Sequence, residues 1–249
     1  ARMSQTFSKA SLTYFGASAL LAILAIFTKE NAFTLPLVIL LVEACFLQTK
    51  PLGDLLKDKR ILLAMGTIVL GLILVVSTYP MQIFAPIPPQ HGHTYAVTPL
   101  NYLWTQFSVI IKYIQLLFLP LSQNLDYDYR IANQFFELRT VLSLVALLGL
   151  LSWAVFRFDR FRLLAFTIFW FFVTLSIESS IIPIEDLIFE HRTYLPAVGF
   201  CIFLSYGIWI LLGTRNRSAA IALLMLIVGS NAYLTYARNK VWKDEISLW

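Results

Sequence analysis

Long apolar runs dominate this sequence and restrict the folds that are open to it. Seven of them are separated by short polar segments, at residues 11–28, 33–48, 61–79, 139–156, 163–177, 194–213 and 218–237. A helix needs about 20 apolar residues to cross a bilayer, with about 17 as a common lower limit. The second and fifth runs are short by this standard and would have to borrow flanking residues. We therefore predict an all-α, polytopic membrane protein with about seven spans.

The composition agrees with this prediction. Hydrophobic residues make up 59% of the chain and charged residues only 13%, whereas a soluble domain is about 25% charged. The net charge of +5 does not indicate a nucleic-acid-binding protein, because the basic residues lie in short loops between apolar runs. The sequence also lacks a Gly-rich phosphate loop, a GxSxG elbow and an HExxH motif, so NTPase, hydrolase and zinc-protease functions have no support.

An eighth apolar run, residues 102–119, is ambiguous, and the loop charges decide between two topologies. If it does not cross, one side of the membrane holds eleven of the nineteen Lys and Arg residues, in segments 1–10, 49–60, 157–162 and 214–217. Short basic loops stay in the cytoplasm, so we predict an inner N-terminus and an outer C-terminus. The eighth run, with Lys112 in its middle, then lies in or dips into the outer interface. Three basic residues that follow the last span run against this scheme: Arg238, Lys240 and Lys243.

The densest group of charges lies in residues 179–196, between two apolar runs. Five charged or titratable residues fall within eight positions there: Glu185, Asp186, Glu190, His191 and Arg192. Charge beside a bilayer is costly, so this cluster is either a working site or a self-neutralising network that caps two spans. We favour the working site, because His191 and Arg192 directly precede a span and can meet an anionic headgroup. Arginine also offers phosphate a bidentate fork.

A tight turn, FTKEN at residues 27–31, joins the first two runs. In one interpretation Lys29 extends its ammonium toward the interface, and Glu30 complements the dipole of the following helix. In the other, Lys29 pairs with a phosphate beside Glu30 as a potential base. The sequence leaves both interpretations open.

The long loop at residues 80–138 carries two further patterns. Its Pro-rich start contains His91 and His93, but no third metal ligand lies nearby, so we expect a lid over a cavity instead. Asp126 and Asp128 form a DxD pattern, which can hold a divalent cation against a diphosphate. Alternatively, these two carboxylates and Arg130 orient an acceptor or a sugar, and the neighbouring tyrosines equally suit an interfacial aromatic belt.

Four segments resemble a known group of membrane proteins. They are FTKEN (27–31), LWTQFSVIIKYIQLLFLPLSQNLDYDY (103–129), FEHRTYLP (189–196) and RNKVWKDEISLW (238–249). With these segments the chain resembles bacterial multispanning proteins that carry a periplasmic tetratricopeptide-repeat domain. Those proteins are similar to the eukaryotic transmembrane-and-tetratricopeptide-repeat O-mannosyltransferases, and both look like GT-C glycosyltransferases.

The resemblance implies a domain organisation and a location. Residues 1–237 would form a GT-C-like transmembrane domain, and 238–249 would begin an extracytoplasmic repeat region. We expect the chain to be a piece of a longer protein, whose first outer loop would carry an acid upstream of Ala1. The protein would lie in the bacterial inner membrane with its active face on the periplasmic side.

The resemblance also implies an activity. The protein would move a sugar from a polyprenyl-phosphate-linked donor to an extracytoplasmic acceptor such as a protein hydroxyl, with an optional divalent cation, Mg²⁺ or Mn²⁺. Glu30 or Glu190 would stand in as the base, while Lys29, His191 and Arg192 would neutralise the departing phosphate. Two alternatives are an oligosaccharide ligase or polymerase that uses a lipid-diphosphate glycan, and a noncatalytic membrane anchor for a repeat scaffold.

Overall fold

The computed structural model describes the whole chain except residues 1–8, 79–83, 89–95, 122, 125–126 and 244–249. The described residues form nine α-helices, several short 3₁₀ and π-helical turns and one isolated β-bridge, between Ile87 and Val97. The helices are α1 (Lys9–Ile26), α2 (Leu35–Val42), α3 (Leu52–Leu55), α4 (Lys59–Thr78), α6 (Pro99–Phe118), α7 (Leu138–Phe156), α8 (Arg162–Leu175), α9 (Tyr194–Ile208) and α10 (Arg217–Asn239). The predicted all-α class is confirmed.

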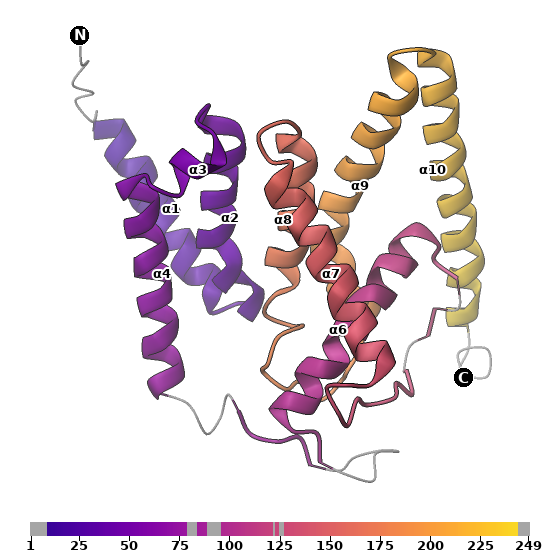
Figure 1. The fold of residues 1–249 in the computed structure, drawn as a ribbon, viewed down its shortest axis with the longest axis horizontal. Coiled ribbons are helices and arrows are strands. Elements are labelled where there is room, and N and C mark those ends of the chain that lie inside the picture. The colour runs from indigo at the N-terminus through magenta and orange to yellow at the C-terminus, as the bar shows by residue number, and fades with distance from the viewer. Residues whose placement is uncertain (1–8, 79–83, 89–95, 122, 125–126, 244–249) are drawn as a thin grey trace.

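The loops between the long helices gather at two ends of the molecule. The basic connections from α2 to α4, from α7 to α8 and from α9 to α10 all lie at the upper end in Figure 1. The segments that follow α4 and α8 lie at the opposite end, which we call the lower end. This is the two-sided distribution that the loop charges predict; which end faces the cytoplasm stays a prediction.

The prediction of seven spans is wrong. In the described part of the chain, five helical stretches are long and apolar enough to cross a membrane: Glu30–Leu47, Lys59–Thr78, Leu138–Phe156, Glu190–Gly213 and Arg217–Asn239. Helix α8 has only 14 residues, which span about 21 Å of a hydrocarbon layer that is about 30 Å thick. Helix α1 has 18 residues, and its described part contains a shorter apolar helix, Gly16–Ile26.

The core is built around α6, the helix of the ambiguous eighth run. Pro99 occupies its first turn, and the Thr98 side chain accepts a hydrogen bond from the Asn101 backbone N–H, so its start is well capped. Eight of its side chains are buried, and α6 packs against α7. The main core cluster joins Tyr102 and Tyr113 of α6 to side chains of α7, α8 and the segment before α9. Helix α6 is not one of the five candidate spans, and eight buried side chains make it a core element. Its position in or near the outer interface stays a prediction.

Helices α8 and α9 pack closely at Gly199. A Cβ atom there would lie 2.7 Å from Trp170 Cδ1 and 2.9 Å from the Thr167 carbonyl oxygen, so a larger residue would push the helices apart. The Trp170 indole also donates a hydrogen bond of 2.9 Å to the Leu195 carbonyl in the first turn of α9. These contacts fix the position of the segment that enters α9.

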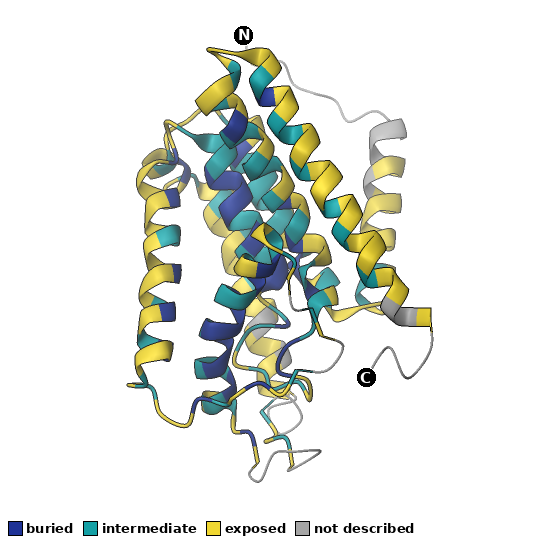
Figure 2. Ribbon diagram, turned by 90° about the vertical axis from the view of Figure 1, so that its right-hand side faces the viewer, coloured by how far each residue is buried: buried dark blue, intermediate teal, exposed yellow. Residues whose placement is uncertain are grey.

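The outer helices present apolar surfaces. Almost nothing of α4 or α10 is buried inside the protein, and large side chains such as Leu63, Leu70 and Val228 are more than half exposed. Figure 2 shows buried residues in the middle of the molecule and exposed ones along the outer helices. Apolar faces of this size are unfavourable in water and are satisfied by lipid.

Candidate functional site

The lower end of the molecule holds two separate polar groups. We call the first the buried cluster; it consists of Lys29, Asn31, Tyr102, Glu178 and Arg192. We call the second the polar pocket; it has a volume of about 390 Å³ and is lined by Gln123, Asn124, Glu190, His191, Thr235, Arg238 and Asn239. Each group draws on segments that are far apart in the sequence. Each also contains residues from the predicted site.

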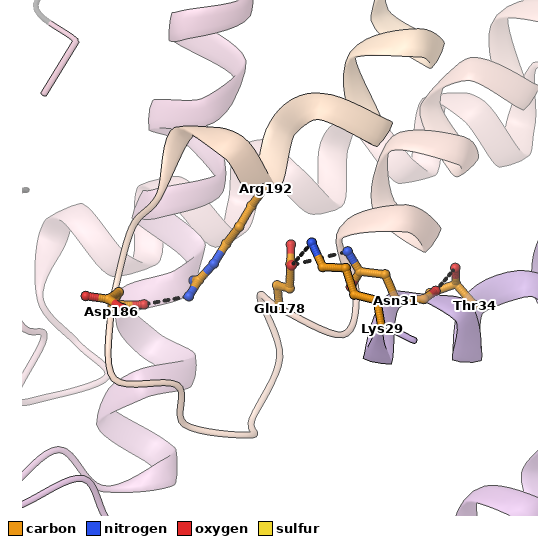
Figure 3. A network of polar contacts seen from close by, with 6 residues as sticks. All are labelled: Lys29, Asn31, Thr34, Glu178, Asp186 and Arg192. Carbon is orange, nitrogen blue, oxygen red and sulfur yellow. Dashed lines mark hydrogen bonds and ion pairs between the residues drawn. The ribbon is translucent and has the colours of Figure 1, made fainter. Parts of the chain in front are cut away.

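Glu178 connects the α1–α2 turn to the end of α8. Its Oε1 atom accepts a hydrogen bond of 3.2 Å from Asn31 Nδ2 and lies 3.7 Å from Lys29 Nζ (Figure 3). Glu178 is only 8% exposed, whereas the Lys29 side chain is 55% exposed. An ion pair that is this open to solvent contributes less than about 1 kcal/mol. The cluster therefore positions Lys29 near the lower end without immobilising it.

Arg192 points into the protein. It lies in the 3₁₀ turn Glu190–Thr193 and is 5% exposed. Its Nη2 donates a hydrogen bond of 2.8 Å to the Asp186 carbonyl (Figure 3). Its Nη1 lies 3.5 Å from the Tyr102 hydroxyl. The Tyr102 hydroxyl donates in turn to the Glu178 carbonyl at 2.8 Å. Arg192 thus ties the segment between α8 and α9 to α6, with its guanidinium already bound to protein groups.

The polar pocket lies where the segment after α6, the start of α9 and the end of α10 meet. Glu190 Oε1 accepts a hydrogen bond of 2.9 Å from the Asn124 backbone N–H and another from the Tyr127 hydroxyl. Partial burial and this bond to Glu190 raise the pKa of Tyr127, so the phenol stays protonated and remains a donor. Glu190 is therefore held by one of its oxygens and faces the pocket.

His191 and Arg238 supply the basic groups of this pocket. His191 is exposed, and Arg238, in the last turn of α10, is half-buried. The sequence treats Arg238 only as a charge on the unexpected side of the last span. That exception to the positive-inside rule could have identified Arg238 as a candidate site residue, because a basic residue on the outer side requires an explanation other than topology.

The other predicted site residues are scattered. Glu30 is exposed at the start of the 3₁₀ turn Glu30–Thr34, and Asp128 is exposed in the loop after α6. Arg130 Nη2 lies 3.7 Å from Glu137 Oε2 and lines a different pocket from that of Glu190. Asp126, like the histidine pair of the proposed lid, lies outside the described residues. The structure therefore joins Lys29 to one group and Glu190 with His191 to another.

A divalent cation remains a prediction. Among the residues that the structure describes, no group of three or more His, Cys, Asp or Glu side chains could hold a metal ion. One half of the DxD pattern, Asp126, is outside that set.

An apolar groove is formed among the core helices. It has a volume of about 180 Å³ and lies between α6, α7, α8 and α9. Its lining is almost entirely apolar and includes Phe118, Phe171, Phe200 and Phe203. A groove of this kind suits a hydrocarbon chain.

Comparison with known proteins gives a partial similarity. The chain is 35% identical over 77 residues to the Protein O-mannosyl-transferase Tmtc2 of Drosophila melanogaster. The match covers 27% of this chain and 8% of the fly protein, so this chain spans a small part of the relative's length. No protein-family model matches the chain, and no solved structure matches it. The chain therefore has a distant, partial similarity to an O-mannosyltransferase and the helices of a multi-pass membrane protein.

Proposed function

We propose that this chain is the membrane domain of a glycosyltransferase. It would transfer a sugar from a polyprenyl-phosphate-linked donor to a hydroxyl group of an extracytoplasmic protein. The observation that carries the proposal is the polar pocket, which combines the Glu190 carboxylate with His191 at one end of a set of apolar helices. The partial similarity to a protein O-mannosyltransferase supports the same reaction class.

Glu190 is the base in this proposal. The acceptor oxygen attacks the anomeric carbon of the sugar, and the bond from that carbon to the phosphate oxygen breaks. The phosphate leaves with the bonding electron pair, and the acceptor proton passes to Glu190. Both hydrogen-bond donors to this carboxylate bind Oε1, which presents Oε2 to the acceptor. A positioned base of this kind contributes about 10²–10⁴-fold to the rate.

The remaining predicted residues take supporting roles. Lys29 is exposed and only loosely paired, so it can turn toward an anionic headgroup at the same end of the molecule. Asp128 and Arg130 are both exposed and could orient the acceptor. Arg192 has a structural role in this proposal. Its buried guanidinium contacts the Tyr102 hydroxyl and the Asp186 carbonyl and so holds the segment that carries Glu190.

A transfer assay tests the proposal. The full chain is reconstituted in proteoliposomes with a labelled polyprenyl-phosphate sugar and a peptide containing Ser and Thr, and transfer of label is measured. Glu190→Gln is expected to lower the rate about 100-fold or more without lowering the unfolding temperature. Asp54→Asn is the control, because Asp54 is an exposed acid of the α2–α4 connection at the upper end. Wild-type transfer by Glu190→Gln would remove Glu190 as the base.

Further variants and donors separate the alternatives. Loss of transfer in Glu30→Gln or Glu178→Gln, with Glu190→Gln still active, would move the base to the α1–α2 turn or to the buried cluster. Transfer only from a lipid-diphosphate glycan would favour the ligase or polymerase. A wild-type protein that transfers nothing would favour the noncatalytic anchor.

A further inference from the structure

We propose that the polar pocket binds the phosphate of the lipid-linked donor and that Arg238 is its principal cation. The inference rests on the proposed function and names the substrate group that the site holds. It moves the phosphate away from Arg192, where the sequence alone placed it, to an arginine at the end of the last helix. Three observations carry it: the state of Arg238, the lining of the pocket and the apolar surface around it.

The burial and the contacts of Arg238 are those expected of a cation that binds a ligand. It is half-buried and lines the pocket, yet the structure shows no hydrogen bond or ion pair from its guanidinium to another described residue. The helix dipole favours a positive charge in the last turn of α10, but it does not explain why the side chain forms a pocket wall. A half-buried guanidinium is partly withdrawn from water, and a phosphate would supply it with a bidentate partner.

Arg192 differs from Arg238 both in its burial and in the partners of its guanidinium. It is almost completely buried, and its guanidinium is bonded to the Asp186 carbonyl and lies beside the Tyr102 hydroxyl. To bind a phosphate, its guanidinium would have to give up the hydrogen bond to the Asp186 carbonyl and the contact with the Tyr102 hydroxyl, and a hydrogen bond from a charged group contributes about 1.5–3 kcal/mol. The pocket at Arg238 requires no such rearrangement.

The rest of the lining supplies hydrogen-bond donors to an anion. His191 and the side-chain amides of Gln123, Asn124 and Asn239 can all donate hydrogen bonds. Glu190 opposes an anion, but its Oε1 already accepts two hydrogen bonds. A phosphodiester carries one negative charge, so with Glu190 ionised and Arg238 positive the occupied pocket holds one net negative charge until Glu190 takes a proton.

Charge balance improves as the reaction proceeds. When the sugar leaves, the lipid phosphate gains negative charge while Glu190 takes the acceptor proton. The attraction to Arg238 therefore increases and the repulsion from Glu190 disappears. Interactions that strengthen along the reaction are the ones that accelerate it.

The surroundings suit a phosphate that is attached to a hydrocarbon chain. Helix α10, which carries Arg238, exposes apolar side chains such as Leu226 and Val228. The apolar groove includes Phe118 near the end of α6, shortly before Gln123, and Phe200 of α9, the helix that begins just after His191. A lipid could therefore place its phosphate in the polar pocket and its tail along these helices.

Lipid binding tests the inference separately from sugar transfer. The full chain is placed in nanodiscs that contain either a polyprenyl monophosphate or the corresponding polyprenol, and binding is measured by native mass spectrometry and by the unfolding temperature. Arg238→Gln is expected to weaken binding of the polyprenyl monophosphate about 10- to 100-fold and to leave polyprenol binding unchanged. Arg217→Gln is the matched control, because Arg217 is an exposed arginine at the opposite end of the same helix.

The outcomes either support or overturn the inference. A folded Arg238→Gln variant that binds the polyprenyl monophosphate like the wild type overturns it, and so does equal wild-type affinity for the phosphate and the alcohol. If Arg238→Gln does not fold, Arg238→Lys keeps the charge but loses the fork; wild-type affinity in that variant also contradicts the inference. Inorganic phosphate forms a separate arm. If it stabilises the wild type as strongly as the lipid phosphate does, the pocket binds free phosphate and the lipid assignment fails.

Sugar transfer, measured in the same preparations, separates this inference from the proposed function. A wild type that transfers no sugar but binds the lipid phosphate through Arg238 would end the proposed function and keep the phosphate site. A wild type that transfers sugar, but whose binding of the lipid phosphate does not depend on Arg238, would keep the proposed function and end the phosphate site.

Discussion

The buried cluster and the polar pocket lie at the same end of the molecule and use the same kinds of side chain in opposite ways. In the cluster, Arg192 is enclosed and its guanidinium meets protein acceptors. In the pocket, Arg238 lies on a wall and meets no described partner through a hydrogen bond or ion pair. Glu190 and Arg192 are only two residues apart, yet they belong to different groups. The position of a charged residue near a membrane therefore does not show that it binds a ligand. Whether its charged group is already bonded to other protein groups distinguishes a structural residue from a candidate binding residue.

The largest expected effect is on folding. Arg192→Met should lower the free energy of unfolding by about 3–5 kcal/mol, because it leaves the Asp186 carbonyl and the Tyr102 hydroxyl without their buried partner. Thermal unfolding in nanodiscs measures the change, with Arg217→Met as the control at an exposed site. A loss of lipid-phosphate binding without loss of stability would return Arg192 to the binding site.

Tyr102→Phe should have a smaller effect. It removes the hydroxyl that donates to the Glu178 carbonyl and lies beside Arg192, at an expected cost of about 1–3 kcal/mol. The same unfolding experiment checks this value. Because Tyr102 belongs to the cluster and not to the pocket, the affinity for a polyprenyl monophosphate should stay unchanged, and a tenfold loss would contradict the separation of the two groups.

Tyr127→Phe should cost about 1 kcal/mol at neutral pH, the contribution of one hydrogen bond to Glu190. Burial and that bond raise the pKa of Tyr127. The folded protein thus favours the protonated phenol, and its contribution is complete below the ordinary tyrosine pKa of about 10 and falls as the pH rises beyond it. The difference in unfolding free energy between wild type and Tyr127→Phe should therefore shrink above that pH. A constant difference would show that the phenol does not titrate with folding.

The smallest effect is expected at Lys29. Lys29→Ala should change the unfolding free energy by less than about 1 kcal/mol, because its partner Glu178 is 3.7 Å away and the lysine is largely exposed. Raising the salt concentration should reduce even this difference. A larger loss would show that the ion pair of Lys29 with Glu178 is a structural contact and not a loose one.

The sequence predicts the helices and the sides on which the loops lie better than it predicts the spans. Apolar runs and loop charges depend on local composition, and the basic loops do gather at one end. The number of spans depends on where each helix ends, and α8 ends after 14 residues. It ends at Leu175, two residues before the end of the apolar run at residues 163–177.

The site was predictable only in part, because a sequence gives the position of a charged residue in the chain but not the orientation of its side chain in the fold. Residues 190–192 form a 3₁₀ turn that sends Arg192 inward and leaves Glu190 and His191 at the pocket. Arg238, which lines the same pocket, lies 47 positions beyond His191, and no local pattern connects the two. Glu178 directly follows the apolar run at residues 163–177, but only the fold shows that it accepts a hydrogen bond from Asn31.

The location of a bound phosphate tests the account most directly. A cryo-electron microscopy structure of the full chain in nanodiscs with a polyprenyl monophosphate would locate it. We predict phosphate density in the polar pocket, within hydrogen-bond distance of the Arg238 guanidinium and beside His191. Phosphate density against Arg192 or Lys29, with the polar pocket empty, would contradict the account.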